Sequence, residues 1–199
     1  MIAVITGDIV NSTKGHPLVW LPRLKAALNR YGSEPEAWEV YRGDSFQVNL
    51  AVDAALEAAF YLKACIKQEA GFDLRMGIGI GDLNYKSQRV SESNGSAFTR
   101  SGQAFEELGK DLLALVTGDQ QVDEPLRIML SLASLTTDSW TPKTAEVIKL
   151  KLENPYWNQV QLAKKLGKSQ STISEGLSRG GFDQIMQLNE YFKKSLSAL

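Results

Sequence analysis

The sequence predicts an α+β fold in which strand and helix patterns alternate over residues 1–118 and only helical patterns follow. Apolar β-branched runs and alternating segments mark the strands of the first part, whereas the apolar patterns after Gly118 repeat at helical spacing. The hydrophobic and charged fractions, 43% and 23%, are those of an ordinary globular protein with a buried core.

The patterns of the first part predict the order β-α-β-β-α-β. Residues 2–5 form an apolar run that Thr6-Gly7-Asp8 ends, so we expect a buried strand followed by a turn. Next come a helix at 18–31, a hairpin with strands at 38–40 and 46–50, a helix at 54–70 capped by Asp53, and a strand at 74–83. This order is the split unit of ferredoxin-like folds.

The rest of the chain is predicted to be mainly helical. A helix at 95–108 and a strand at 112–116 complete the first part, and helices follow at 125–135, 145–152, 159–166, 169–179 and 182–196. Thr141-Pro142 is typical of a helix start, because the first turn does not need the N–H group that proline lacks. We therefore divide the chain into residues 1–118, a helical bridge at 119–141 and an all-α domain at 142–199.

Gly77, Gly79 and Gly81 alternate along the strand predicted at 74–83. Their spacing differs from that of a dinucleotide-binding loop, and the residues between them are apolar. We expect them to let a helix or a ligand approach the strand closely.

The net charge of −1 hides an asymmetry along the chain. From Lys143 onward there are nine basic and five acidic residues, a balance of +4, whereas the preceding part has 13 basic and 18 acidic residues, a balance of −5. Such a split indicates that one half binds a polyanion. The chain has no run of 18 apolar residues, no basic segment before Asp8, and no second cysteine beside Cys65. We expect a cytoplasmic protein without a membrane segment or a disulfide.

Residues 159–179 match the pattern of a helix-turn-helix. Gly167 permits the tight turn, Ser169 can cap the second helix, and Ile173 and Leu177 anchor that helix on the first. The residues predicted to contact DNA are Lys168, Ser169, Gln170, Ser171, Thr172, Ser174 and Arg179, flanked by Lys164 and Lys165. Glutamine can bond N6 and N7 of adenine together, and basic side chains contact phosphates.

Two residues depart from this pattern. Lys168 stands where an apolar residue is usual, and Gly176 weakens the second helix by about 1 kcal/mol relative to alanine. The alternative interpretation is a helical pair that packs on the first domain or on another subunit. Specific DNA sites usually contain two half-sites about 34 Å apart, so DNA binding implies a homodimer.

Asp8 and Asp44 form a second candidate site. Asp8 lies at the end of the first predicted strand and Asp44 lies in the hairpin turn, and in a β-α-β-β unit these positions can converge at one edge of the sheet. Two carboxylates with open positions bind Mg²⁺ or Mn²⁺ together with the phosphates of a nucleotide. Capping of a helix and of a turn is the alternative role for the two aspartates.

These residues lie in segments that resemble class III nucleotidyl cyclases. Asp8-Ile-Val-Asn-Ser-Thr resembles their first metal motif, Gly43-Asp-Ser-Phe their hairpin motif, and residues 74–83 their following strand. The resemblance covers roughly residues 1–116. It implies a palm domain in which Asp8 and Asp44 are metal ligands and the Ile9 carbonyl assists.

The chain departs from the cyclases at the residues that bind the nucleotide. Glu39-Val-Tyr stands where the base-selecting lysine is expected, and Thr99 and Gln103 stand where an asparagine and an arginine are expected. Arg100 is near but out of register. Without those groups a cyclase loses most of its stabilisation of transition-state charge.

Nearly the whole chain is similar to the SatD family. The similarity lies in the Gly7-Asp-Ile strand end, the Gly95-Ser-Ala-Phe helix and the Ser169-Gln-Ser-Thr-Ile-Ser helix. It implies a regulator and no particular reaction. We therefore expect a DNA-binding transcriptional regulator whose palm domain dimerises or senses a nucleotide. A metal-dependent nucleotidyl cyclase or transferase with a helix-turn-helix tail, and a structural helical adaptor, are the alternatives.

Overall fold

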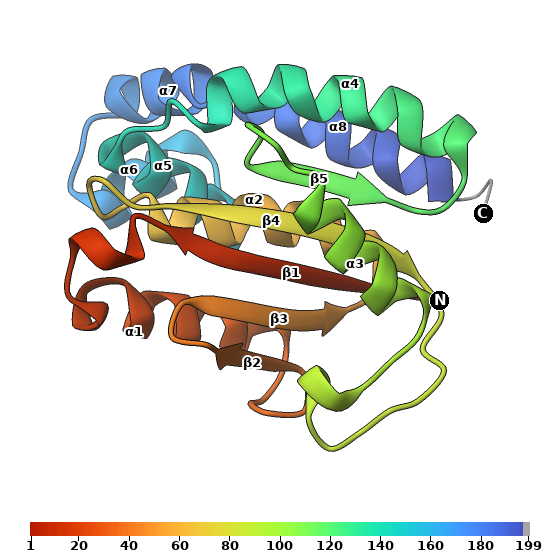
Figure 1. Cartoon of the computed structure of the whole chain (residues 1–199). Helices are drawn as coiled ribbons and strands as arrows, with labels where there is room; N and C mark the ends of the chain where they lie inside the picture. The colour runs from red at the N-terminus through yellow and green to blue at the C-terminus, as the bar shows by residue number, and fades with distance from the viewer. Residues whose placement is uncertain (197–199) are drawn as a thin grey trace.

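The computed structural model describes residues 1–196, which form five β-strands and eight α-helices (Figure 1). The strands are β1 (Ile2–Val10), β2 (Trp38–Tyr41), β3 (Ser45–Leu50), β4 (Asp73–Gly81) and β5 (Leu113–Val116). The helices are α1 (Pro17–Leu28), α2 (Ala55–Ile66), α3 (Ser96–Glu106), α4 (Gln120–Thr137), α5 (Pro142–Glu153), α6 (Gln159–Leu166), α7 (Gln170–Arg179) and α8 (Phe182–Ser195). The α+β class is confirmed. In the part of the chain described, no helix is long and apolar enough to cross a membrane.

The strands form one sheet with the order β2-β3-β1-β4-β5. β1 pairs antiparallel with both β3 and β4, and β5 pairs parallel with β4. The predicted β-α-β-β-α-β order of the first elements is confirmed. The central position of β1 places Asp8 directly between Ser45 of β3 and Arg75 of β4.

β1 is longer than the sequence pattern predicts. The chain continues as a strand through Gly7 and Asp8 and turns only at Asn11, whose φ is 63°. A Cβ atom at residue 7 would lie 2.7 Å from the Phe46 ring and from the Arg75 carbonyl oxygen. Gly7 therefore allows its neighbours to pack against β1 and does not end the strand, and Asp8 belongs to the strand itself.

The two faces of the sheet are covered differently. Figure 1 shows α3 in front of the sheet and α2 behind it, and α2 packs on the apolar side chains of β4. A Cβ atom at Gly79 would lie 2.2 Å from the backbone oxygen of Ala97 and the backbone nitrogen of Ser101 in α3. The alternating glycines of β4 thus admit a helix, which is the first of the two roles predicted for them.

Two predicted helix starts were wrong. Asp53 makes no capping bond to α2, which follows a short 3-10 turn, Val52–Ala54. α4 begins at Gln120, because Asp119 accepts a hydrogen bond from the Gln121 backbone N–H at 2.8 Å. Pro125 lies inside this helix and does not start it.

The later helices share the core of the sheet. One continuous apolar cluster includes residues of β1, β4 and α2 together with Ile148 of α5 and Phe192 of α8. α6 and α7 contribute mainly to a smaller cluster, which contains Leu162, Ala163 and Ile173. The division at residues 118 and 141 stays a prediction, and α5 and α8 pack directly on α2.

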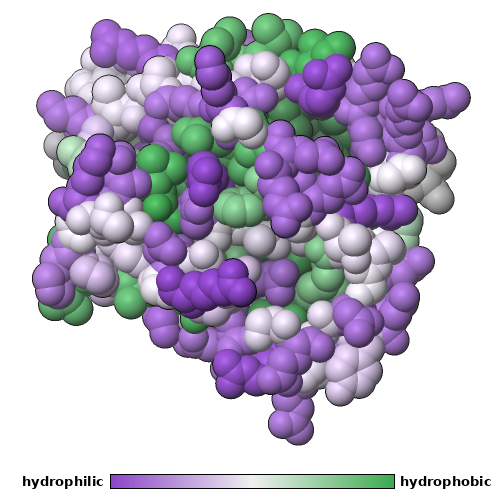
Figure 2. Space-filling model, in the orientation of Figure 1, coloured by the Kyte–Doolittle hydropathy of each residue, from purple (hydrophilic) through white to green (hydrophobic). Residues whose placement is uncertain are grey.

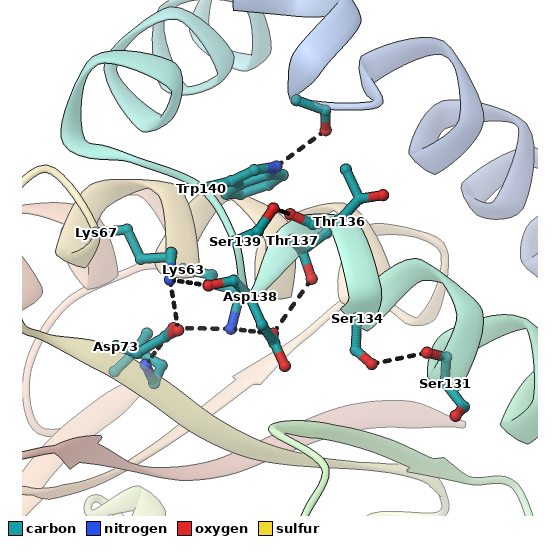
Figure 3. Close-up of polar contacts among 12 residues, drawn as sticks. Lys63, Lys67, Asp73, Ser131, Ser134, Thr136, Thr137, Asp138, Ser139 and Trp140 are labelled. Atoms are coloured by element: carbon teal, nitrogen blue, oxygen red, sulfur yellow. Dashed lines mark hydrogen bonds and ion pairs between the residues drawn. The ribbon is translucent and has the colours of Figure 1, made fainter.

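Buried charges join the two parts of the chain (Figure 3). Lys63 Nζ of α2 lies 2.7 Å from Asp73 Oδ1 of β4 and 2.8 Å from Asp138 Oδ1 after α4. Lys67 Nζ donates to Asp73 Oδ2 and to the Asp138 carbonyl oxygen, both at 2.7 Å. Two residues further on, Trp140 Nε1 donates to the carbonyl oxygen of Gly180 at 2.9 Å. The segment after α4 is therefore bonded to the sheet through Asp138 and to the end of α7 through Trp140.

Replacing Gly79 with alanine is expected to lower the free energy of unfolding by about 1–3 kcal/mol, because the added methyl group meets backbone atoms that cannot rotate away. Chemical denaturation measures the change. Gly102→Ala is the matched control, since its methyl group would meet nothing within 4 Å and alanine favours the helix by up to about 1 kcal/mol. Equal stability of the two variants would contradict the close packing of α3 on β4.

Candidate nucleic-acid interface and open sheet face

α6 and α7 are joined by a short, well-defined turn. Gly167 ends α6 in the left-handed conformation, with φ of 63°, as the sequence predicted. Ser169 caps α7 by accepting a hydrogen bond from the Thr172 backbone N–H at 3.2 Å. At the other end of α6, Asn158 and Gln161 form a reciprocal capping box. Both helices therefore begin at positions that their own side chains determine.

One face of α7 packs inward. Ile173 is fully buried beside Leu162 and Ala163 of α6, as expected. Gly176 has a further role, since a Cβ atom there would lie 3.1 Å from a methyl carbon of Val147 in α5. The glycine that weakens α7 thus allows α5 to approach it closely.

The opposite face of α7 is exposed and polar. It presents Ser169, Gln170, Ser171, Thr172, Ser174 and Arg179, six of the seven residues predicted to contact DNA. The Gln170 side chain is restrained by a hydrogen bond, in which its Nε2 atom donates to Oε1 of Gln159 at 3.2 Å. The sequence pattern does not predict this role of Gln159, although both glutamines are the first residues of their helices.

The basic residues around this face differ in their partners. Lys168 forms an ion pair with Glu146 of α5, which accounts for a charged residue where an apolar one is usual. Arg179 pairs with Glu175 one turn earlier at 3.4 Å, and both side chains are exposed. Lys164 and Lys165 are exposed on α6. Phosphate contacts from this region would therefore come more readily from α6 and Arg179 than from Lys168.

Asp8 and Asp44 lie at the same end of the sheet, as predicted. Asp8 is paired with Ser45, the residue next to Asp44, and the Ile9 backbone N–H donates to the Asp44 carbonyl oxygen at 3.3 Å. Asp44 Oδ2 accepts a hydrogen bond from the hydroxyl of Ser12.

Arg75 is the partner that the sequence analysis missed. Its Nε atom donates to Asp8 Oδ1 at 3.0 Å, and its Nη2 atom donates to Asp8 Oδ2. The guanidinium carbon lies 5.3 Å from the centre of the Phe105 ring in α3. The hydrogen bond to Asp8 raises the pKa of Arg75, partial burial opposes this, and the charges of Asp8 and Asp44 add to it. The cation facing the carboxylates is therefore part of the chain.

This arrangement does not offer a metal two open carboxylates. Both oxygens of Asp8 accept from Arg75, and among residues 1–196 no group of three or more His, Cys, Asp or Glu side chains is placed to hold a metal ion. A metal bound by Asp8 and Asp44 would first require Arg75 to release Asp8.

The sheet face beside Asp8 carries further polar groups. Gln47 Nε2 donates to Thr6 Oγ1 at 3.2 Å, and Thr6 Oγ1 lies 3.0 Å from Ser101 Oγ of α3. Glu39 accepts from Arg89 and Ser91 of the loop between β4 and α3. Gln47, Thr6 and Ser101 thus form one set of hydrogen-bonded groups, and Glu39 forms a second set with the loop.

The two residues that stand in place of the nucleotide-binding groups of cyclases bond within α3. Thr99 Oγ1 donates to the Gly95 carbonyl oxygen at 3.4 Å, and Gln103 Nε2 donates to Glu107 at 3.2 Å. Arg100 donates to the Ile80 carbonyl oxygen at 2.6 Å. None of these hydrogen bonds leads to Asp8 or Asp44.

Comparison of this chain with protein-family models, with curated proteins and with solved structures gave no match in any of the three. The α6–α7 pair offers exposed polar side chains on well-capped helices. The sheet face offers charged groups that already pair with one another.

Cys65 in α2 is expected to be chemically inert in the folded protein. Burial raises the pKa of its thiol to about 11, so at pH 8 only roughly one molecule in a thousand carries the reactive thiolate. Reaction with a disulfide reagent, followed by absorbance, is expected to be slow in buffer and fast in concentrated urea. A fast reaction of the native protein would contradict the burial of Cys65.

Proposed function

We propose that this protein is a DNA-binding transcriptional regulator of the SatD type. In this proposal α6 and α7 are a helix-turn-helix with α7 as the recognition helix, and residues 1–118 are a ferredoxin-like palm domain. The observation that carries the proposal is the hydrogen bond between Gln159 and Gln170 at the starts of the two helices. It orients an amide on an exposed helix end, where it can reach the edge of a base.

The chemistry of the paired amides suits adenine. Gln170 gives one amide hydrogen to Gln159, and it retains a second hydrogen and its carbonyl oxygen. Adenine presents N7 as an acceptor and N6 as a donor in the major groove, which one amide can bond together. Because Gln159 already restricts the rotation of Gln170, less side-chain entropy is lost when the base is bound.

The remaining exposed side chains suit the DNA backbone. Ser171, Thr172 and Ser174 are short and can reach phosphates or base edges, and Lys164 and Lys165 add positive charge beside them. The balance of +4 after residue 142 supports contact with a polyanion. The Lys168–Glu146 pair supports a positioning role for Lys168, which joins the turn to α5.

A second proposal concerns the palm domain, which would dimerise or sense a nucleotide. Asp8, Asp44 and Arg75 place three charged groups at one end of the sheet, and this favours a polar or charged ligand over an apolar one. The cyclase or transferase alternative requires Mg²⁺ or Mn²⁺ on Asp8 and Asp44, and the closed Asp8–Arg75 pair opposes it.

Gln170→Ala is expected to weaken binding to a DNA site selected from a random pool by about 1–3 kcal/mol, or roughly fivefold to 150-fold. Its binding to unrelated DNA is expected to stay nearly unchanged, because contacts with phosphates supply most of the affinity for non-specific DNA. Fluorescence anisotropy at two salt concentrations measures both effects.

Gln88→Ala is the matched control, because Gln88 is an exposed glutamine in the loop between β4 and α3. It is expected to bind like the wild type. Absence of DNA binding by the wild type at about 50 mM salt, where phosphate contacts are strong, would refute the DNA-binding proposal for the free protein.

Arg75→Gln is expected to raise the affinity for Mn²⁺ at least tenfold, since it releases both oxygens of Asp8 and removes a like charge from the metal. Isothermal titration with MnCl₂ measures the change. Arg23→Gln removes an arginine of α1 that pairs with Glu69, and it is expected to leave Mn²⁺ binding at the wild-type level. Tight Mn²⁺ binding by the wild type would contradict the closed pair and would favour the enzyme alternative.

A further inference from the structure

The outer face of α4 carries an exposed apolar ridge. Ile128, Leu132 and Leu135 are 52%, 62% and 75% exposed and follow the i, i+4, i+7 spacing of one helix face. Residues 128–137 contain no charged side chain, although 23% of the chain is charged. Figure 2 shows hydrophobic side chains along the top of the view, where α4 lies in Figure 1.

A groove runs beside this ridge, between α4 and α8. Its volume is about 570 Å³. Met129, Ala133 and Thr136 of α4 line one side, and Leu188 and Tyr191 of α8 line the other. The ridge and the groove are thus neighbours on one surface of the molecule.

We propose that this surface binds a second copy of the same chain, with α4 packed antiparallel against α4 of the partner across a twofold axis. A twofold interface uses the same patch on both subunits, so the patch must complement itself. A ridge beside a groove meets this requirement, because each copy places its ridge in the groove of the other. The antiparallel pairing puts Leu132 nearest the axis and brings Ile128 of each copy to Leu135 of the other.

The size of the surface agrees with a dimer. The exposed parts of Ile128, Leu132, Leu135 and Tyr191 amount to roughly 450 Å², the size of the largest apolar patch on a typical monomer, and such patches are often binding sites. A stable interface buries about 800 Å² on each copy. The patch supplies the apolar centre, and the polar side chains of α8 around it, among them Gln184 and Gln187, supply a rim.

The groove ends beside the proposed recognition helix. Ser178 and Arg179, the last residues of α7, line this end, so a partner seated in the groove also approaches α7. The consequence for DNA binding rests on the proposed function, since paired half-sites need two recognition helices held at one spacing. Dimerisation itself rests only on the α4–α8 surface and is tested without DNA.

Sedimentation velocity of the full chain is expected to give twice the monomer mass of 21.9 kDa for the wild type at micromolar concentration. Leu132→Lys is expected to give the monomer mass, because it places a charge at the centre of the interface on each copy. Its far-ultraviolet circular dichroism is expected to match the wild type, since residue 132 is exposed. Leu18→Lys is the matched control, as Leu18 of α1 is 75% exposed and lies outside the surface, and it is expected to remain a dimer.

A second variant tests the placement of the axis. Leu132→Cys in a Cys65→Ser background is expected to form a disulfide between two copies under mild oxidation, whereas Leu18→Cys is not. A monomeric wild type, or a dimer that Leu132→Lys leaves intact, would overturn the proposal. Weaker binding of the selected DNA site by Gln170→Ala with an unchanged dimer mass separates the two functions, because that variant leaves the α4–α8 surface intact.

Discussion

Burial of Lys63, Lys67 and Asp73 is the constraint on which the arrangement of the later helices depends. Taking charges out of water costs several kcal/mol per ion, and the cost is offset only when every charge has a partner at short range. Asp138 is one of those partners and belongs to the segment after α4. The segment after α4 must therefore pass close to Lys63. Any other path would leave a buried charge without a partner. These charged residues determine where the segment after α4 lies more than they add to the stability of the fold. Replacing all of them with apolar residues can give an equally stable protein.

The segment after Asp138 connects this cluster of buried charges to the candidate DNA interface. Trp140 is buried and bonds the Gly180 carbonyl at the end of α7, and α5 contacts both α2 and α7. An exposed helix that reads DNA needs an inner face held by rigid neighbours, since its contacts must meet bases within tenths of an ångström. The shared core behind α5 and α8 supplies that support, and a flexibly linked pair of domains would not.

The sequence predicted the helices and strands better than it predicted the contacts between side chains. Helical and alternating patterns predicted the order of strands and helices, and Gly167 and Ser169 predicted the turn and cap of α7. The predicted end of β1 was wrong because Gly7 was interpreted as a turn residue. Its small size instead allows Phe46 to pack against the strand. The pairing of Arg75 with Asp8 joins residues 67 positions apart, so it depends on strand order and register, which local patterns do not determine. The Gln159–Gln170 contact likewise depends on the angle at which α6 and α7 cross, which the sequence pattern does not determine.

The pairing of Asp8 with Arg75 affects how the charge at this end of the sheet responds to divalent ions in solution. A diffusible divalent ion leaves and returns as its free concentration changes, whereas a guanidinium attached to β4 is present at all times. The charge balance at this end of the sheet is therefore encoded in the chain, and it stays constant when the supply of magnesium or manganese in the cell rises or falls.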